Sequence, residues 1–109
     1  MTSLLASSRN TRTSRARALR AVTARVLGVD IGTFESKGVI ADAQGAVVAM
    51  ATRPHKMIVP QPGWAEHRAN EDWWDDFTFI AKKLIADSGV KPADIKAVAT
   101  SGIGPCMLP

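Results

Sequence analysis

Four residues of the segment 26–42 have types and spacing that suit binding of an anion together with a metal ion. Asp30 ends a nearly continuous apolar run, and Gly32 and Thr33 follow it at once. Lys37 comes four residues after Thr33. Gly32 has no Cβ to keep a phosphate away, and successive backbone N–H groups in such a turn can form an anion-binding concavity. We interpret this turn as a site for the phosphates of a nucleotide and a metal ion.

Two of these residues also have ordinary structural explanations. An Asp beside a Gly is often a turn carboxylate, but Asp30 stands at the carboxyl end of a predicted strand, where open α/β sheets bind ligands. Lys37 could equally be a solvated lysine of the following strand. The sequence contains neither G-x-x-x-x-G-K-[ST] nor a G-x-G-x-x-G that opens a helix. A Walker-type phosphate loop and a dinucleotide fingerprint are therefore excluded.

The elements that position this turn are predicted as three strands, one helix and a further strand. Apolar runs indicate a first strand over residues 25–31, a second that ends at Asp42, a third over 47–51 and a last, short buried strand over 95–99. The helix is expected over residues 70–88, with Asn70 as its N-cap and Gly89 as its left-handed end. We predict an α/β fold in which the first three strands form an antiparallel meander and the helix crosses over to the last strand.

The helix and the loop before it contain further polar residues of interest. Apolar and aromatic side chains recur at helical spacing and predict a core-facing stripe, so Asp75 and Asp76 are expected to face water. The Pro-rich connection over residues 53–69 contains Glu66 and His67, which could face a ligand. One Glu and one His do not make a metal site, and no spaced cluster of His or Cys completes one.

The net charge of +4 lies in the N-terminal segment. Residues 1–25 contain six arginines and no acid, whereas residues 26–109 contain eight basic and ten acidic residues, a balance of −2. We therefore expect no nucleic-acid interface in the folded part. Without an apolar run of 18 residues we expect no membrane span, and the single Cys106 excludes an internal disulfide.

Three interpretations of residues 1–25 are open: a disordered Arg-rich leader, an organelle transit peptide, or a basic arm for nucleic acid or anionic lipid. A secretory signal is excluded, because no apolar core follows the charges. We expect a cytoplasmic protein, or a mitochondrial one if the segment is a transit peptide.

Three segments, in order, resemble the FGGY family of carbohydrate kinases, which includes xylulose, gluconate and glycerol kinases. The first runs from Asp30-Ile31-Gly32-Thr33 through Lys37 to Asp42. The second comprises residues 62–67 (PGWAEH) and residues 71–74 (EDWW), which are similar to the family's Pro-Gly-Trp-x-Glu segment and to the tryptophans that open its first helix. The third, Thr100-Ser101-Gly102, matches the family's next strand end.

The resemblance implies an RNase-H-like domain of the superfamily of actin, sugar kinases and heat-shock-protein ATPases. It also implies ATP-dependent phosphorylation of a sugar or polyol hydroxyl with Mg²⁺. By this analogy Asp30 acts through the metal ion and its water, Gly32 and Thr33 lie at the ATP phosphates, and Lys37 takes the place of the family's phosphate-contacting Arg or Lys. Such phosphoryl transfer depends mainly on positioning and charge neutralisation.

The substrate pocket is expected, by the same resemblance, at the last predicted turn. Ser101, Gly102 and Ile103 would line the sugar or polyol site. Many relatives carry Gln and then His or Arg after the Ser-Gly pair, whereas Ile103, Gly104 and Pro105 stand here. This departure leaves the identity of the sugar open.

The resemblance further implies that the general-base Asp lies beyond residue 109 and that the adenine site lies in a second domain. We therefore expect residues 26–109 to be a truncated N-terminal kinase domain that is inactive alone. Two alternatives are a non-catalytic orphan domain and another ATPase of the same superfamily, such as an activator of a dehydratase. The Pro-Gly-Trp and Trp-Trp segments favour the sugar kinase.

Overall fold

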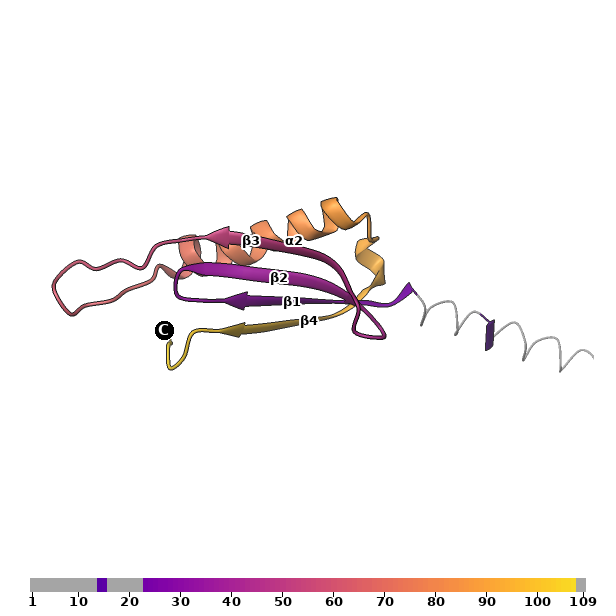
Figure 1. Ribbon diagram of the computed structural model, residues 1–109, viewed down its shortest axis with the longest axis horizontal. Helices are drawn as coiled ribbons and strands as arrows, with labels where there is room; N and C mark the ends of the chain where they lie inside the picture. The colour runs from indigo at the N-terminus through magenta and orange to yellow at the C-terminus, as the bar shows by residue number, and fades with distance from the viewer. Residues whose placement is uncertain (1–13, 16–22, 108–109) are drawn as a thin grey trace, which may run out of the picture.

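A computed structural model describes residues 14–15 and 23–107 of the chain (Figure 1). Most of the predicted leader, residues 1–25, lies outside the described residues, so its three interpretations stay predictions. The first strand begins at Arg25, at the predicted boundary. Within the described ranges no helix is long and apolar enough to cross a membrane.

The fold is a four-stranded mixed sheet with one long helix on one face (Figure 1). The strand order is β3-β2-β1-β4. The elements are the strands β1 (Arg25–Ile31), β2 (Glu35–Asp42), β3 (Val47–Pro54) and β4 (Ile95–Gly102), the π-helical turn η1 (Ala69–Trp74), the α-helix α2 (Asp75–Ser88) and the 3₁₀ turn η2 (Pro92–Asp94). The predicted meander and crossover are both confirmed.

Two tight turns join the three strands of the meander. In the turn between β2 and β3, Asp42 Oδ1 accepts hydrogen bonds of 2.9 Å from the backbone N–H groups of Gln44 and Ala46, and Gly45 takes a φ of 84°. A short polar side chain that bonds backbone two residues on is typical of such turns. β3 runs three residues further than predicted, to Pro54, because it stays paired with β2 as far as Glu35.

The helical segment begins differently from the prediction. Its first six residues form the π-helical turn η1, its N-cap position is Arg68 rather than Asn70, and no side chain caps it. The end agrees with the prediction, because Gly89 follows α2 in the left-handed conformation with a φ of 67°. Such a glycine is the usual way to end a helix without steric strain.

The core lies between α2 and the sheet. Its buried members are Leu27, Val29, Ile40, Ala51, Ile80 and Leu84. Gly38 permits this contact, since a Cβ built there would lie 2.3 Å from Ile80 Cγ2. The absence of a side chain on β2 therefore allows the helix to approach the sheet backbone.

β4 is parallel to β1 and lies at the edge of the sheet. It runs to Gly102, so Thr100, Ser101 and Gly102 belong to the strand and not to a turn as predicted. The expectation of a buried strand is also wrong for the described part, because every residue of β4 after Ile95 is exposed. The parallel pairing places the carboxyl ends of β1 and β4 side by side.

Candidate functional site

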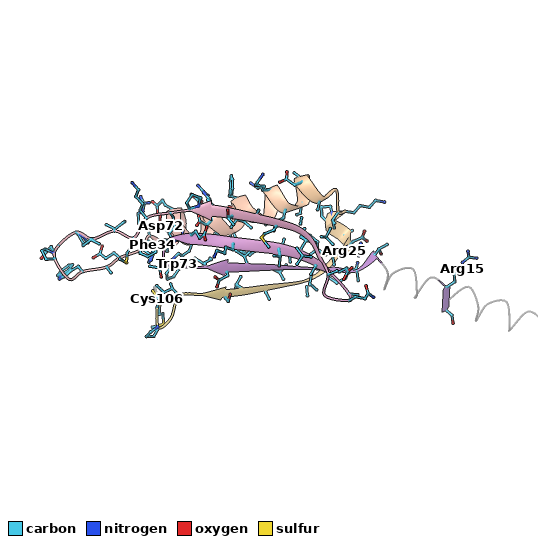
Figure 2. All side chains as sticks on the ribbon, viewed as in Figure 1. Arg15, Arg25, Phe34, Asp72, Trp73 and Cys106 are labelled. Carbon is cyan, nitrogen blue, oxygen red and sulfur yellow. The ribbon has the colours of Figure 1, made fainter. Side chains whose placement is uncertain are left out.

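The predicted site residues meet at one end of the sheet. In the strand register Asp30 of β1 pairs with Lys37 of β2 on one side and with Ser101 of β4 on the other. Figure 2 shows that the β1–β2 turn with Phe34, the helix start with Trp73 and the last segment with Cys106 all lie at this end, far from Arg25. The side chains of Asp30 and Lys37 lie on the sheet face opposite α2, since their neighbours Val29 and Gly38 face the helix.

Asp30 is held by a hydroxyl and keeps one oxygen available. Ser101 Oγ donates a hydrogen bond of 2.6 Å to Asp30 Oδ1. Within residues 23–107 no hydrogen bond engages Asp30 Oδ2, and the side chain is exposed. Lys37 contacts Glu35 instead of the turn, with 3.0 Å between Nζ and Oε1, and is 58% exposed. Lys37 is thus the direct neighbour of Asp30 in the strand register, and its exposed side chain is free to move.

Gly32 is required by a close approach within the turn. Its N–H donates to Glu35 O at 3.0 Å, and a Cβ built on Gly32 would lie 2.8 Å from that oxygen. The glycines with positive φ are Gly45, Gly63 and Gly89, so Gly32 is needed for the space at its α-carbon and not for a left-handed backbone. Any larger residue would force the turn open.

His55 fixes the turn from inside and was missed by the sequence analysis. Its Nε2 lies 2.9 Å from the carbonyl oxygen of Gly32 and 3.1 Å from that of Thr33. Its backbone N–H donates to Phe34 O at 2.9 Å. The side chain of His55 is only 6% exposed. Its position directly after Pro54, in a segment that we assigned to a loop, concealed this role.

Asp76 is buried beneath His55, which contradicts the prediction that it faces water. Its side chain is 2% exposed, and Oδ2 lies 2.7 Å from His55 Nδ1 and accepts a 2.7 Å hydrogen bond from Ser36 Oγ. Arg53 Nε lies 3.3 Å from Asp76 Oδ1. The expectation rested on the charge of Asp76, whereas its position, four and eight residues before Ile80 and Leu84, belongs to the core face of the helix. Asp75 is exposed, as predicted.

A second buried carboxylate stabilises the start of the helix. Asp72 accepts hydrogen bonds from the backbone N–H and the guanidinium of Arg68, with 2.7 Å to the N–H and 2.9 Å to Nη2. The hydrogen bond from Arg68 lowers the pKa of Asp72 against the opposing effect of burial, and the same bond raises the pKa of Arg68. This pair takes the place of the predicted Asn70 cap.

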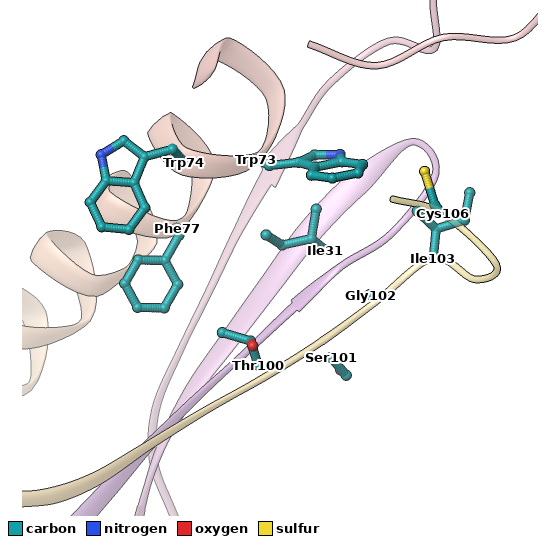
Figure 3. Close-up of a pocket in the computed structure, with 9 residues that line it drawn as sticks. All are labelled: Ile31, Trp73, Trp74, Phe77, Thr100, Ser101, Gly102, Ile103 and Cys106. Atoms are coloured by element: carbon teal, nitrogen blue, oxygen red, sulfur yellow. The ribbon is translucent and has the colours of Figure 1, made fainter. Parts of the chain in front are cut away.

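A hollow of about 490 Å³ opens between the helix start and the end of β4 (Figure 3). The three predicted substrate residues Ser101, Gly102 and Ile103 line it, opposite two tryptophans and a phenylalanine. The complete lining is Ile31, Trp73, Trp74, Phe77, Thr100, Ser101, Gly102, Ile103 and Cys106. A second hollow of about 430 Å³, on the sheet face without the helix, contains Asp30, Lys37 and Ser101. Ser101 therefore borders both.

The donor set fits a magnesium ion held partly by phosphates. Mg²⁺ is usually bound through one or two carboxylates together with waters and substrate phosphates, and Asp30 supplies one exposed carboxylate oxygen beside the turn. In the described part of the chain no three His, Cys, Asp or Glu side chains group around one point. The arrangement is thus unlike an all-protein cage such as a structural zinc site.

The chain is similar to known carbohydrate kinases in sequence and in fold. The chain is 40% identical over 73 residues to glycerol kinase 2 of Thermotoga maritima, a match that covers 67% of this chain and 14% of that kinase. The solved xylulose kinase of Rhodospirillum rubrum is similar with a TM-score of 0.64 and 30% identity, over 74% of this chain and 16% of that one.

A solved activator of 2-hydroxyisocaproyl-CoA dehydratase from Clostridium difficile, with bound ADPNP, is also similar. Its TM-score is 0.50 at 26% identity, over 73% of this chain and 24% of that one. This breadth of neighbours confirms the predicted RNase-H-like fold. The sequence model of the FGGY family of carbohydrate kinases, N-terminal domain, matches residues 25–107. The chain therefore belongs to the FGGY family of carbohydrate kinases, of whose N-terminal domain it contains a part, and its matches span 14–15% of the length of the glycerol kinases that it resembles.

Proposed function

We propose that this chain provides the phosphate- and metal-binding part of an ATP-dependent carbohydrate kinase. The reaction transfers the γ-phosphoryl group of ATP to a hydroxyl of a sugar or polyol. The observation that carries the proposal is the Asp30–Ser101 hydrogen bond beside the Gly32–Thr33 turn, because it brings a carboxylate, a hydroxyl and unpaired backbone donors together at one sheet end. These are the parts that phosphoryl transfer requires.

The phosphates are assigned to the turn. No hydrogen bond among the described residues uses the N–H groups of Thr33 and Phe34, and two consecutive free N–H groups suit phosphate oxygens. Lys37 lies across the strand pair from Asp30, and its long exposed side chain can exchange Glu35 for a phosphate. The turn would then bind the phosphates through its backbone, with Lys37 supplying positive charge.

Asp30 is assigned to Mg²⁺, through a bound water. When bound, this ion neutralises charge on the β- and γ-phosphates. The chain's own contribution is to orient the carboxylate, which Ser101 does by occupying Oδ1 and leaving Oδ2 for the water. With Oδ1 bound to Ser101 and Oδ2 available, Asp30 is compatible with a Mg²⁺ site that uses a single protein carboxylate.

The sugar or polyol is assigned to the hollow lined by Ser101, Gly102 and Ile103. It is next to Asp30, because Ser101 borders both hollows. Its walls are mostly apolar, and a carbohydrate site of this kind needs further polar groups to fix the hydroxyls. No carboxylate lines it within the described part of the chain, so the general base would come from elsewhere.

Binding of ATP to the full 109-residue chain, with and without Mg²⁺, tests the proposal. Calorimetry should detect binding that depends on Mg²⁺, and Asp30→Asn should weaken it at least about tenfold, which corresponds to about 1.4 kcal/mol. Asp87→Asn is the matched control, because Asp87 is exposed on α2 and its one partner among residues 23–107 is Lys83, at 2.9 Å. Equal binding by the wild-type chain and Asp30→Asn would contradict the assignment.

Phosphoryl transfer distinguishes the kinase from the orphan-domain alternative. We expect the 109-residue chain to bind the nucleotide without phosphorylating glycerol, xylulose or gluconate, the substrates named for its relatives. Turnover of any of them by the purified chain would show that it carries its own general base. Absence of Mg²⁺-dependent nucleotide binding would favour a non-catalytic domain.

A further inference from the structure

His55 connects the β1–β2 turn to a buried carboxylate on α2. Nε2 faces the carbonyl oxygens of Gly32 and Thr33, and Nδ1 faces Asp76 Oδ2 at 2.7 Å. The side chains of His55 and Asp76 are 6% and 2% exposed. The imidazole therefore lies between two groups of acceptors, shielded from water.

These partners determine the protons on the ring. A carbonyl oxygen can only accept, so Nε2 must carry a proton. The Asp76 carboxylate already accepts from Ser36 and is paired with Arg53, which favours its ionised form, and an ionised carboxylate can only accept. Nδ1 must then carry a proton as well, and His55 is an imidazolium.

The other charged and titratable groups near His55 are compatible with this state. Arg53 contacts Asp76 from β3, and the ring of His67 meets that of His55 edge-on at 5.4 Å between centroids. The charge on His55 also helps to lower the pKa of Asp72 on the adjacent helical turn. The negative charges of Asp76 and Asp72 thus both stabilise the positive charge of the imidazolium.

Peptide geometry transmits the position of His55 to the outer side of the turn. The carbonyl of one residue and the N–H of the next belong to one planar trans peptide unit, so they point in opposite directions. Because His55 draws the carbonyls of Gly32 and Thr33 inward, the N–H groups of Thr33 and Phe34 point away from it. Those are the two N–H groups that form no hydrogen bond within the described residues.

We propose that His55 is a positioning residue that, as an imidazolium held by Asp76, aims the Thr33 and Phe34 N–H groups at the phosphate chain of a nucleotide. The inference rests on the proposed function, because it needs phosphates at this turn. His55 touches no phosphate itself. It acts by fixing two peptide planes before the ligand arrives, so that binding does not have to order them.

The chain offers a matched control in His67. Its ring nitrogens are buried and have no hydrogen-bond partner among the described residues, and it packs beside His55 and Trp73. His67→Phe therefore removes a buried imidazole from the same region without removing a hydrogen bond. His55→Phe removes the clamp, and His55→Gln keeps one N–H donor without the charge.

The experiment uses the full 109-residue chain with uniform ¹⁵N labelling and Mg²⁺-tripolyphosphate as the probe. In the wild-type chain the ¹⁵N spectrum should show a proton on both ring nitrogens of His55. The amides of Thr33 and Phe34 should shift on addition of the probe. His55→Phe should weaken probe binding about tenfold or more, His55→Gln should lie between, and His67→Phe should bind within about twofold of wild type.

The outcomes separate this inference from the proposed function. No probe binding by the wild-type chain overturns both. Probe binding that His55→Phe and His55→Gln leave unchanged, or a His55 ring with a single proton, overturns this inference alone. If His55→Phe does not fold, His55→Gln and the wild-type ring spectrum decide. A merely structural His55 would change thermal stability in its variants without changing affinity for the probe in the folded state.

Discussion

Ser101 Oγ donates a 2.6 Å hydrogen bond to Asp30 Oδ1 across 71 positions of sequence. The bond joins the carboxyl ends of two parallel neighbouring strands, β1 and β4, at residues that are paired in the sheet register. It places the predicted substrate residue Ser101 against the predicted metal residue Asp30. A single hydroxyl therefore links the two hollows of the site.

Ser101→Ala should weaken Mg²⁺-dependent ATP binding while leaving the fold intact. The bond orients Asp30, so without it the carboxylate must be ordered when the ligand binds, and a loss of affinity of about tenfold, about 1.4 kcal/mol, is expected. Both residues are exposed, so the free energy of unfolding should change by less than about 0.5 kcal/mol. Calorimetric titration and urea unfolding measure the two effects. Ser101→Thr keeps the hydroxyl and should bind like wild type; a loss equal to that of Ser101→Ala would contradict the assignment.

Gly38→Ala should destabilise the fold through the contact between β2 and α2. The new Cβ would lie 2.3 Å from Ile80 Cγ2 and 3.1 Å from Leu84 Cδ1, both in the core. Overpacking of this kind typically costs about 1–3 kcal/mol. Urea unfolding followed by circular dichroism measures the change in the free energy of unfolding.

Gly28→Ala is the control for that experiment. Gly28 is on the neighbouring strand β1, and a Cβ there would meet only Val39 Cγ2 at 3.9 Å, an ordinary contact distance. We expect a free energy of unfolding within about 0.5 kcal/mol of wild type. Equal destabilisation by the two substitutions would show that the helix contact does not account for the cost.

Much of the sheet could be predicted from local patterns. The apolar run before Asp30 predicts a buried strand, and the polar turn at residues 42–45 predicts the reversal before β3. The turn at Gly32 and Thr33 was also predictable, because its residue types are those that a close backbone approach requires. The order of helix and strand predicted a crossover onto the sheet, whereas the pairing of β4 with β1 is known only from the structure.

The residues that support the turn between β1 and β2 could not be predicted, because His55 and Asp76 are distant from it in sequence. His55 follows Pro54 in a segment with breaker residues, and nothing local indicates that it reaches Gly32, 23 positions earlier. Asp76 precedes the core residues Ile80 and Leu84 by four and eight positions, so helical periodicity places it on the core face, and only its charge suggested that it faces water. The π-helical start at Ala69–Trp74 is different, since its pair of Arg68 and Asp72 is local, four residues apart, and helical spacing did not single it out.

Asp76→Asn should be strongly destabilising. It removes the charge that faces His55 and Arg53 in a site where the carboxylate is 2% exposed. Removing one partner of a buried ion pair costs about 3–5 kcal/mol, and we expect about 3 kcal/mol because Arg53 is partly exposed and can turn toward water. Thermal and urea unfolding measure the loss. Asp75→Asn, at the adjacent exposed position, should be within about 0.5 kcal/mol of wild type. Similar costs at both positions would refute the network.

The Asp72–Arg68 pair should make stability fall in acid. The hydrogen bond from Arg68 lowers the pKa of Asp72 in the folded chain below its ordinary value of 3.8, whereas the unfolded carboxyl keeps that value. The unfolded state therefore binds a proton first as the pH falls. The stabilisation is fully present above about pH 5 and is lost as the pH falls through the folded pKa of Asp72. Urea unfolding of wild type and Asp72→Asn at pH values from about 6 to 2 tests this. The free energy of unfolding should fall less steeply with acid in Asp72→Asn than in wild type, whereas a constant difference between the two chains over that range would contradict the assignment.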